Sequence, residues 1–219
     1  MDGLSVVIPA LNAETLLAGA LTALGPGLEI IVVDGGSTDR TCEIAAEAGA
    51  RVLAAPRGRG SQIAAGIAAA TGPWLLILHA DTRPGAGWRH AVASHRTAPD
   101  RAGYFRFVLD SPAAGARRLE RLVAWRCRVL GLPYGDQGLL IHRDLLRAVG
   151  GVKTLPLMED VDLVRRLGRG RLRLLAADAV TSAARWERDG YLRRSARNVF
   201  CLSLWFAGVP PRIIRRMYG

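Results

Sequence analysis

The sequence predicts an α/β protein with a mainly parallel sheet and helices on both faces. Short segments rich in Val, Ile and Leu alternate with longer segments whose apolar residues recur at helical spacing. Polar turns rich in Gly, Asp and Ser separate these segments, as in βαβ units. With 219 residues, 50% of them apolar and 22% charged, the chain is long enough to fold around its own core.

The first hundred residues show the alternation most clearly. Strands are predicted at residues 4–8, 29–33, 52–54 and 74–78. The helices between them are residues 14–24, a helix capped by Ser37 or Thr38 that runs to Ala48, and an alanine-rich helix that ends at Ala70. Pro9 stops the first strand, and Gly25-Pro26-Gly27 stops the first helix.

The second half has a different rhythm. Strands are predicted at residues 103–109, 138–142 and 171–175, and helices at 114–130, from 143 to 149 and at 159–167. The tail from Trp186 is rich in arginine and is predicted to be helical. Because no linker or internal repeat marks a boundary, we expect one domain over residues 1–219. The change of rhythm divides this domain into two halves, residues 1–100 and residues 101–219.

The charge of the chain is concentrated in its second half. The formal net charge is +11, of which residues 1–100 carry −2 and residues 101–219 carry +13. Such asymmetry favours an anionic partner for the second half. The helix at 114–130 and the helical tail could lie on an anionic membrane, form a homodimer seam, or simply present their arginines to water.

No targeting or spanning segment is expected. The start lacks the basic and apolar regions of a signal peptide, and the apolar run at residues 199–209 is about half of what a bilayer span requires. Three unpaired cysteines suit a reducing compartment. We therefore expect a cytoplasmic protein, with contact at the inner membrane face as an alternative through the basic helices.

Polar residues follow each of the first four strands. Ligands of parallel α/β sheets bind beyond the carboxyl ends of the strands, so these loops are expected to converge. Asp34 could accept hydrogen bonds from a base or ribose, with Gly35 letting the backbone approach, or could merely build a turn. Arg57 and Arg59 could hold a diphosphate or lie in an ordinary exposed loop.

Carboxylates supply the remaining chemistry. Asp81 ends an apolar strand, where it could hold a divalent cation that bridges two phosphates, and His79 could coordinate or be structural. Glu159, Asp160 and Asp162 begin a helix, where the dipole stabilises them, and one of them could act as a general base. The loop Gly135-Asp136-Gln137-Gly138 could position an acceptor or be a simple turn.

The ordered motifs are more specific than any one of them. V-I-P-A-L-N-A-E, I-V-V-D-G-G-S-T-D-R-T, G-R-G-x-Q, L-H-A-D-T, G-D-Q-G and M-E-D-V-D follow one another along the chain. Together they resemble the inverting glycosyltransferases of family two, which have the GT-A fold, a Rossmann-like sheet. The resemblance runs from Ser5 to about Arg169. A chance match of this many ordered motifs is very improbable, given the false-positive rate of single ones.

The resemblance implies a role for each matching residue. Asp160 would be the catalytic base, with Glu159 supporting it. Asp81 would hold Mg²⁺ or Mn²⁺ as the surviving carboxylate of a D-x-D motif, whose first carboxylate is replaced here by His79. Asp136, Gln137, Arg185 and Trp186 would lie on the acceptor side. The donor-binding residues would be Pro9, Ala10, Asn12, Glu14, Asp34, Gly35, Arg57, Gln62, His79, Ala80 and Asp81.

The resemblance also implies the substrates. The donor would be a nucleoside-diphosphate sugar, a UDP-sugar rather than a GDP-sugar, and the acceptor a small molecule or a lipid phosphate. The short length, the H-A-D-T motif and the R-W-E-R-x-G tail resemble most a group of small soluble bacterial members, some assigned to arsenosugar biosynthesis by genomic setting.

Three other classes fit the sequence less well. A nucleotide-sugar pyrophosphorylase needs a glycine-rich loop with a basic pair after the first strand, and a nicotinamide dehydrogenase needs G-x-G-x-x-G there; Pro9 to Glu14 provides neither. A nucleic-acid-binding protein would suit the sequence pI of about 11.0. Because the first half lacks a stripe of basic and aromatic residues, we expect no nucleic-acid partner.

Overall fold

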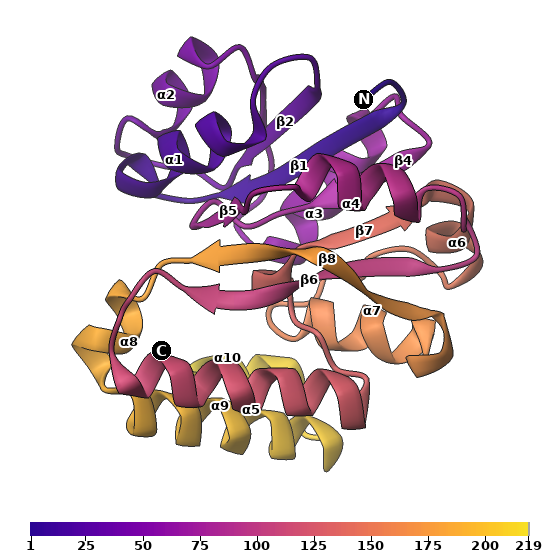
Figure 1. Ribbon diagram of the computed structural model, residues 1–219. Coiled ribbons are helices and arrows are strands. Elements are labelled where there is room, and N and C mark those ends of the chain that lie inside the picture. Colours follow the sequence, from indigo (N-terminus) through magenta and orange to yellow (C-terminus); the bar gives the residue numbers. More distant parts are fainter. Residues whose placement is uncertain (219) are drawn as a thin grey trace.

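The computed structural model describes residues 1–218, and its centre is one mixed eight-stranded sheet with helices on both faces (Figure 1). The strand order is β3-β2-β1-β4-β7-β6-β8-β5. The strands are β1 (Leu4–Ala10), β2 (Glu29–Asp34), β3 (Arg51–Ala54), β4 (Trp74–Ile77), β5 (Thr82–Pro84), β6 (Ala102–Leu109), β7 (Leu139–His142) and β8 (Leu172–Thr181).

The predicted α/β fold is confirmed, and the parallel part of the sheet lies mainly in the first half. Strands β3, β2, β1 and β4 run parallel, whereas β7 pairs antiparallel with both β4 and β6. The parallel pair β6–β8 and the antiparallel pair β8–β5 complete the sheet. Strand β7 therefore joins the two halves of the chain within one sheet.

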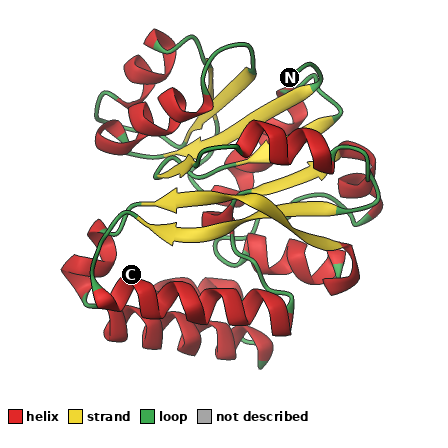
Figure 2. Cartoon of the chain, viewed as in Figure 1, coloured by secondary structure: helices red, strands yellow, loops and turns green. Residues whose placement is uncertain are grey.

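The described residues form ten α-helices, which are red in Figure 2. They are α1 (Glu14–Leu24), α2 (Thr41–Glu47), α3 (Arg59–Ala69), α4 (Trp88–His95), α5 (Ala114–Leu130), α6 (Arg143–Ala148), α7 (Glu159–Leu167), α8 (Ala184–Asp189), α9 (Tyr191–Phe206) and α10 (Pro211–Tyr218). Helices α1, α2 and α4 pack on one face of the sheet, and α3, α5, α6 and α7 pack on the other. No helix within residues 1–218 is both long and apolar enough to cross a membrane.

The central strands are buried on both faces, which explains their unbroken apolar sequences. Val7 and Ile77 contribute to the core cluster beneath α3, α5 and α7, whereas Val6 and Leu76 contribute to the cluster beneath α1, α2 and α4. This alternation follows from the two-residue period of a strand.

The structure corrects the predicted bounds of two elements and adds others. Strand β8 runs to Thr181, beyond the predicted end at Leu175, because residues 178–181 pair with β6 and partly with β5. Helix α2 begins at Thr41, three residues after Thr38, because the Ser37 hydroxyl instead donates to Asp34 and accepts from the amide of Asn12. The short strand β5 and helix α4 were not predicted. The basic tail is helical, as expected, but consists of the three helices α8, α9 and α10.

Candidate active site

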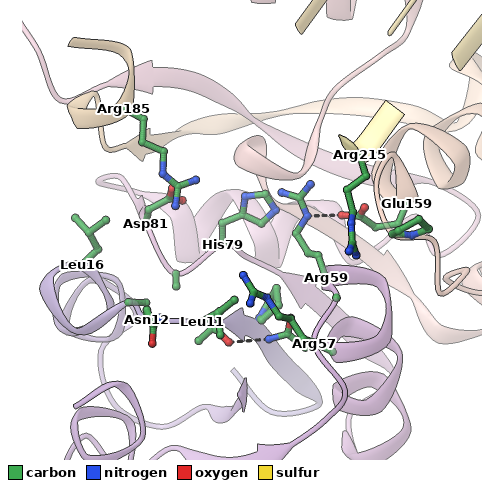
Figure 3. A pocket seen from close by; sticks show the side chains of 17 residues that line it. Leu11, Asn12, Leu16, Arg57, Arg59, His79, Asp81, Glu159, Arg185 and Arg215 are labelled. Carbon is green, nitrogen blue, oxygen red and sulfur yellow. Dashed lines mark hydrogen bonds and ion pairs between the residues drawn. The ribbon is translucent and has the colours of Figure 1, made fainter. Parts of the chain in front are cut away.

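The carboxyl ends of the parallel strands meet at one edge of the sheet, where a cavity of about 770 Å³ opens (Figure 3). The register of β1 and β2 places Ala10 opposite Asp34, and His79 follows β4 by two residues. The predicted residues that line the cavity are Pro9, Ala10, Asn12, Arg57, Gln62, His79, Ala80, Asp81, Glu159 and Arg185. Leu16, Pro156 and Arg215 also line it and were not predicted from the sequence.

Asp34 builds the loop after β2 rather than lining this cavity. Its carboxylate accepts hydrogen bonds from the amides of Gly36 and Ser37 and from the Ser37 hydroxyl. Burial opposes ionisation of Asp34, but the bonds from Ser37 and Gly36 keep its pKa below the usual range. Glu14 similarly accepts from the amide of Arg40. The observed contacts of Asp34 are thus those of a residue that builds a turn. Contact of Asp34 and Glu14 with the donor stays a prediction.

Asn12 ties the loop after β1 to the loop after β2. Its backbone has a positive φ of 48°, and its side-chain oxygen accepts from the amide of Thr38 at 2.9 Å. The Ser37 hydroxyl in turn accepts from the amide of Asn12 at 2.9 Å. Asn tolerates this left-handed conformation better than most residues. The two loops therefore form one rigid wall of the cavity.

Gln62 fastens helix α3 to the ends of β1 and β2. Its amide nitrogen donates to the carbonyl oxygens of Ala10 at 2.7 Å and Val33 at 2.8 Å, and the residue is only 4% exposed. A Cβ at Gly35 would lie 3.1 Å from this amide group, so glycine permits the close approach. Gln62 thus lines the predicted donor site and holds its floor together.

An ion pair joins residues that lie 100 positions apart in the chain. The Arg59 guanidinium, from the first turn of α3, donates to the carboxylate of Glu159 at the start of α7. Glu159 is 2% exposed, and burial raises its pKa although Arg59 acts in the opposite direction. The side chain of Glu159 therefore faces Arg59 and anchors this cation in the cavity (Figure 3).

Asp160 points to the other side of the same helix start. Its two carboxylate oxygens accept from the amides of Gly135 at 2.9 Å and Val161 at 2.8 Å. Burial would raise the pKa of Asp160, but Arg59 and the Gly135 amide outweigh it and lower that pKa. A Cβ at Gly135 would clash with the His79 ring, so the Gly135 loop packs directly against His79. Burial, together with the positive charge of Arg59, lowers the pKa of His79 to about 4, so its imidazole is neutral at pH 7. The ionised carboxylate of Asp160 therefore lies near a neutral imidazole.

A second cavity of about 150 Å³ contains Asp160 and adjoins the first. Arg59, His79, Asp81 and Arg185 line both cavities. Asp160, Asp136 and Trp186 line only the second, as do the unpredicted residues Tyr134, Leu157, Met158, Arg194 and Asn198. The predicted base and the predicted metal-binding carboxylate thus lie in one continuous space.

The aromatic side of the second cavity is built by α8 and α9. Trp186 stacks on Tyr191 with ring centroids 6.3 Å apart, and the Arg194 guanidinium lies 5.2 Å from the Trp186 ring. Figure 3 shows Arg185, from the same short helix, extending toward Asp81. Both predicted acceptor-side residues of α8 therefore line the space beside Asp160.

Gln137 lies instead in the protein interior. It is 2% exposed, its amide nitrogen donates to the carbonyl of Phe105 at 3.1 Å, and its oxygen accepts from the amide of Tyr134 at 3.2 Å. These internal bonds leave it no face toward either cavity. Its observed contacts hold the loop that carries Gly135 and Asp136.

The carboxylates present fit a cation that is held jointly with phosphate. No cluster of three or more His, Cys, Asp or Glu side chains suited to a metal occurs within residues 1–218. Asp81 lines both cavities, and a buried oxygen of Asp136 in the second cavity has no hydrogen-bond partner among the described residues. Mg²⁺ commonly binds through one or two carboxylates together with substrate phosphates and water. Asp81 could therefore hold such an ion, with Asp136 nearby.

Asp136 should make the stability of the metal-free protein pH-dependent. Burial raises the pKa of Asp136 to about 6, although the positive charge of Arg126 acts in the opposite direction. The folded state thus binds a proton more tightly than the unfolded state. This contribution to stability, about 3 kcal/mol, is present below pH 4 and is lost as the pH rises through 6.

We expect Asp136→Asn to raise the free energy of unfolding at pH 7.5 relative to wild type and to change it less at pH 4. Urea unfolding in EDTA at both pH values measures the difference. The control is Asp144→Asn, since Asp144 is exposed on α6. An equal effect of Asp136→Asn at both pH values would contradict the assignment.

Comparisons with known proteins agree with this geometry. Residues 5–109 match the sequence model of glycosyl transferase family 2. An uncharacterized glycosyltransferase of Mycobacterium tuberculosis is 44% identical over 87 residues, which are 39% of this chain and 40% of that protein. A glycosyltransferase of PGL/p-HBAD biosynthesis from the same species is 35% identical over 88 residues, 35% of this chain and 34% of its own length. The matched stretches thus span well under half of both relatives.

Solved structures share the fold over nearly the whole chain. TarS of S. aureus, residues 1–349 in complex with UDP-GlcNAc, has a TM-score of 0.66 at 15% identity and covers 98% of this chain and 70% of that one. Glucosyl-3-phosphoglycerate synthase of Mycobacterium tuberculosis, in complex with Mn²⁺, UDP and its product, has a TM-score of 0.59 at 22% identity over 94% and 80%. Residues 5–109 thus resemble glycosyl transferase family 2, and the solved structures show that the fold they share extends over nearly the whole chain.

Proposed function

We propose that this protein is a metal-dependent inverting glycosyltransferase that transfers a sugar from a UDP-sugar to an acceptor hydroxyl. The observation that carries the proposal is the continuity of the two cavities, which share Arg59, His79, Asp81 and Arg185. The larger cavity would hold the donor, and the smaller one the acceptor. Solved relatives of the same fold bind UDP, UDP-GlcNAc and Mn²⁺, which supports a UDP-sugar as donor.

Asp160 would act as the general base. Its lowered pKa keeps it ionised at neutral pH, ready to accept the proton of an acceptor hydroxyl. The hydroxyl oxygen would bond to the anomeric carbon while the bond from that carbon to the phosphate oxygen breaks, and the electron pair would leave with UDP. Because attack and departure occur on opposite faces of the sugar, the anomeric configuration inverts.

The cationic groups of the donor cavity would stabilise the departing diphosphate. Arg57, Arg185 and Arg215 line it, while Arg59 is engaged by Glu159. A divalent ion held by Asp81 would neutralise charge that develops on the leaving phosphate. Fixed charges of this kind act without reorganising during the reaction, so positioning and neutralisation supply most of the acceleration.

We further propose a small-molecule acceptor, in line with the resemblance to small bacterial members of the family, some of them assigned to arsenosugar biosynthesis. The second cavity, at about 150 Å³, leaves limited space between Asp160 and Trp186. A lipid phosphate whose head group alone enters this space is the alternative, and the surface described below favours contact with a membrane.

Substituting the base should stop transfer without preventing donor binding. We expect Asp160→Asn to lower the rate at least about 10²-fold, since a neutral amide cannot accept the proton. UDP affinity should stay within a few-fold of wild type. The measurement is UDP release from a panel of UDP-sugars with a mixture of small hydroxylated acceptors, alongside UDP calorimetry. Asp162→Asn is the control, because Asp162 pairs with Lys153 and Arg166 away from both cavities. Full activity of Asp160→Asn would show that Asp160 is not the general base.

Removing Asp81 should uncouple nucleotide binding from the metal. For wild type we expect Mn²⁺ to raise UDP affinity by roughly tenfold, because the ion bridges the carboxylate and the diphosphate. In Asp81→Ala this increase should disappear, while affinity in EDTA changes little. Calorimetry of UDP with and without Mn²⁺ measures both quantities. An unchanged metal response in the variant would place the cation elsewhere.

An exposed apolar layer favours attachment to an anionic membrane. Eleven large apolar residues are exposed among those whose side chains the structure describes, and ten of them lie on α5, α9 and α10. Leu192, Val199 and Phe206 recur every seven residues along α9, and Leu122 and Trp125 lie on α5, which contacts α9. Figure 1 shows these helices together at one end of the molecule. Such apolar stripes can insert into the interface of a bilayer.

The charge of this layer distinguishes a membrane from a second copy of the chain. Within α5, α9 and α10 the sole acidic residue is Glu120, which is bound by Arg117 and the Leu109 amide. Arginines such as Arg118, Arg121 and Arg128 are exposed on α5. Two copies joined through this face would bring arginines together, whereas anionic lipids would neutralise them. We therefore propose an anionic membrane surface as its partner.

Vesicle sedimentation tests the membrane proposal. We expect pelleting with phosphatidylglycerol vesicles at low salt, weaker at high salt because arginine contacts are screened. The triple variant Trp125→Gln, Val199→Gln and Phe206→Gln should bind about tenfold more weakly, since each change removes apolar burial. Leu174→Gln is the control, because Leu174 is 59% exposed on β8 outside the layer. Absence of pelleting at low salt, or a dimer in solution, would contradict the proposal.

A further inference from the structure

A hollow of about 440 Å³ beside the donor cavity is lined by four arginines. Arg57 comes from the loop before α3, and Arg212, Arg215 and Arg216 come from the C-terminal helix α10. Thr154, Leu155 and Pro156 form its opposite wall, together with Gly58 and Ser61. We call this space the arginine hollow. Segments separated by about 150 residues therefore bring four guanidinium groups to one place.

No acidic side chain of the described chain lines the arginine hollow, and its cations have no carboxylate partner there. None of the four arginines takes part in an ion pair or side-chain hydrogen bond found within residues 1–218. Like charges gathered in this way repel unless an anion lies between them. Guanidinium groups present paired N–H donors that match the oxygens of phosphate.

The arginine hollow adjoins the donor cavity but has lining residues of its own. The two spaces share Arg57, Gly58, Pro156 and Arg215, whereas Ser61, Thr154, Leu155, Arg212 and Arg216 line the hollow without lining the donor cavity. Residues 154–158 connect all three spaces, because Leu157 and Met158 line the cavity of Asp160. A ligand anchored in the hollow could thus extend along this loop toward the base.

We propose that the arginine hollow binds the phosphate group of the acceptor. The proposal rests on the proposed function, since it assumes that the donor occupies the larger cavity and that Asp160 receives the acceptor proton. The diphosphate of the donor would lie near Asp81, which does not line the arginine hollow. A second phosphate, carried by the acceptor, would therefore neutralise Arg212 and Arg216 and fix the acceptor beside the sugar. The phosphate ester could be water-soluble or the head group of a lipid.

Calorimetry of inorganic phosphate with the UDP- and Mn²⁺-saturated protein tests the site directly. Bound UDP and Mn²⁺ occupy the diphosphate position, so added phosphate can bind only elsewhere. We expect one equivalent of phosphate to bind in the arginine hollow. In the double variant Arg212→Gln, Arg216→Gln we expect phosphate affinity to fall at least tenfold and UDP affinity to stay within twofold. The control Arg118→Gln, Arg128→Gln removes two exposed charges from α5 and should leave phosphate affinity within twofold.

Three outcomes would overturn the proposal. These are no phosphate binding by the UDP-saturated wild type, an unchanged affinity in the α10 variant, or an equal loss in the α5 control, which would indicate general charge attraction. The first outcome is measured on wild type alone, so it tests the proposal even if the α10 variant does not fold. If wild type does not bind UDP, the proposed function fails, and phosphate titration of the free protein still reports on the hollow.

Two probes separate the sources of the phosphate. Glycerol 3-phosphate that competes with inorganic phosphate supports a water-soluble ester. Both variants should bind phosphatidic acid vesicles more weakly than wild type, because both remove arginines of the basic helices. Binding that is at least tenfold weaker in the α10 variant than in the α5 control supports a lipid head group. If neither probe depends on Arg212 and Arg216, the hollow does not bind phosphate esters and the proposal is wrong.

Discussion

The partly buried ion pair between Arg59 and Glu159 is the interaction on which the candidate site depends. It joins the start of α3 to the start of α7, and so fixes the donor half of the site against the half that carries Asp160. Glu159 is almost fully buried, so loss of Arg59 would leave an uncompensated carboxylate in the interior. The same guanidinium influences two further groups. It contributes, after burial, to the lowered pKa of His79, and it helps to lower the pKa of Asp160. Arg59 thus acts together with burial to keep the imidazole neutral, and together with backbone amides to keep the neighbouring carboxylate ionised, as a general base requires.

The antiparallel strand β7 determines where that carboxylate lies. Because β7 pairs with β4, the loop that precedes β7 returns to the carboxyl end of β4, where His79 and Asp81 follow. Gly135 in this loop packs against His79 and donates its amide to Asp160. A side chain at position 135 would push the loop away from His79 and break this contact. The mixed sheet therefore brings the metal-binding candidate and the base candidate together, which a wholly parallel sheet would not do in this way.

Much of the fold and part of the site follow from the sequence, for identifiable reasons. Apolar periodicity predicts the buried strands and amphipathic helices, and the parallel order of β1, β2 and β4 predicts that their following loops converge. The helix at Glu159–Leu167 has the predicted bounds. Local sequence cannot reveal which polar side chains bond to buried backbone groups instead of facing a cavity. Gln137, predicted on the acceptor side, is such a residue. Strand β5 has three residues, too few for a period, and Arg215 reaches the cavity only through the packing of α10. These features arise from tertiary contacts, which leave no signal at their own positions.

The placement of arginines accounts for the charge asymmetry of the chain without a nucleic acid. In the donor cavity, Arg59 is offset by Glu159, and Arg57, Arg185 and Arg215 then outnumber the single carboxylate of Asp81. The remaining positive charge suits a bound diphosphate. Further arginines surround the arginine hollow and flank the apolar stripes of α5 and α9. A nucleic-acid surface would need a continuous basic stripe interleaved with exposed aromatic residues. Here the cations instead form separate groups, each beside a cavity or an apolar face. The basic half of the sequence therefore suits the partners proposed above, a donor diphosphate, an acceptor phosphate and an anionic membrane, each of which carries the negative charge of phosphate.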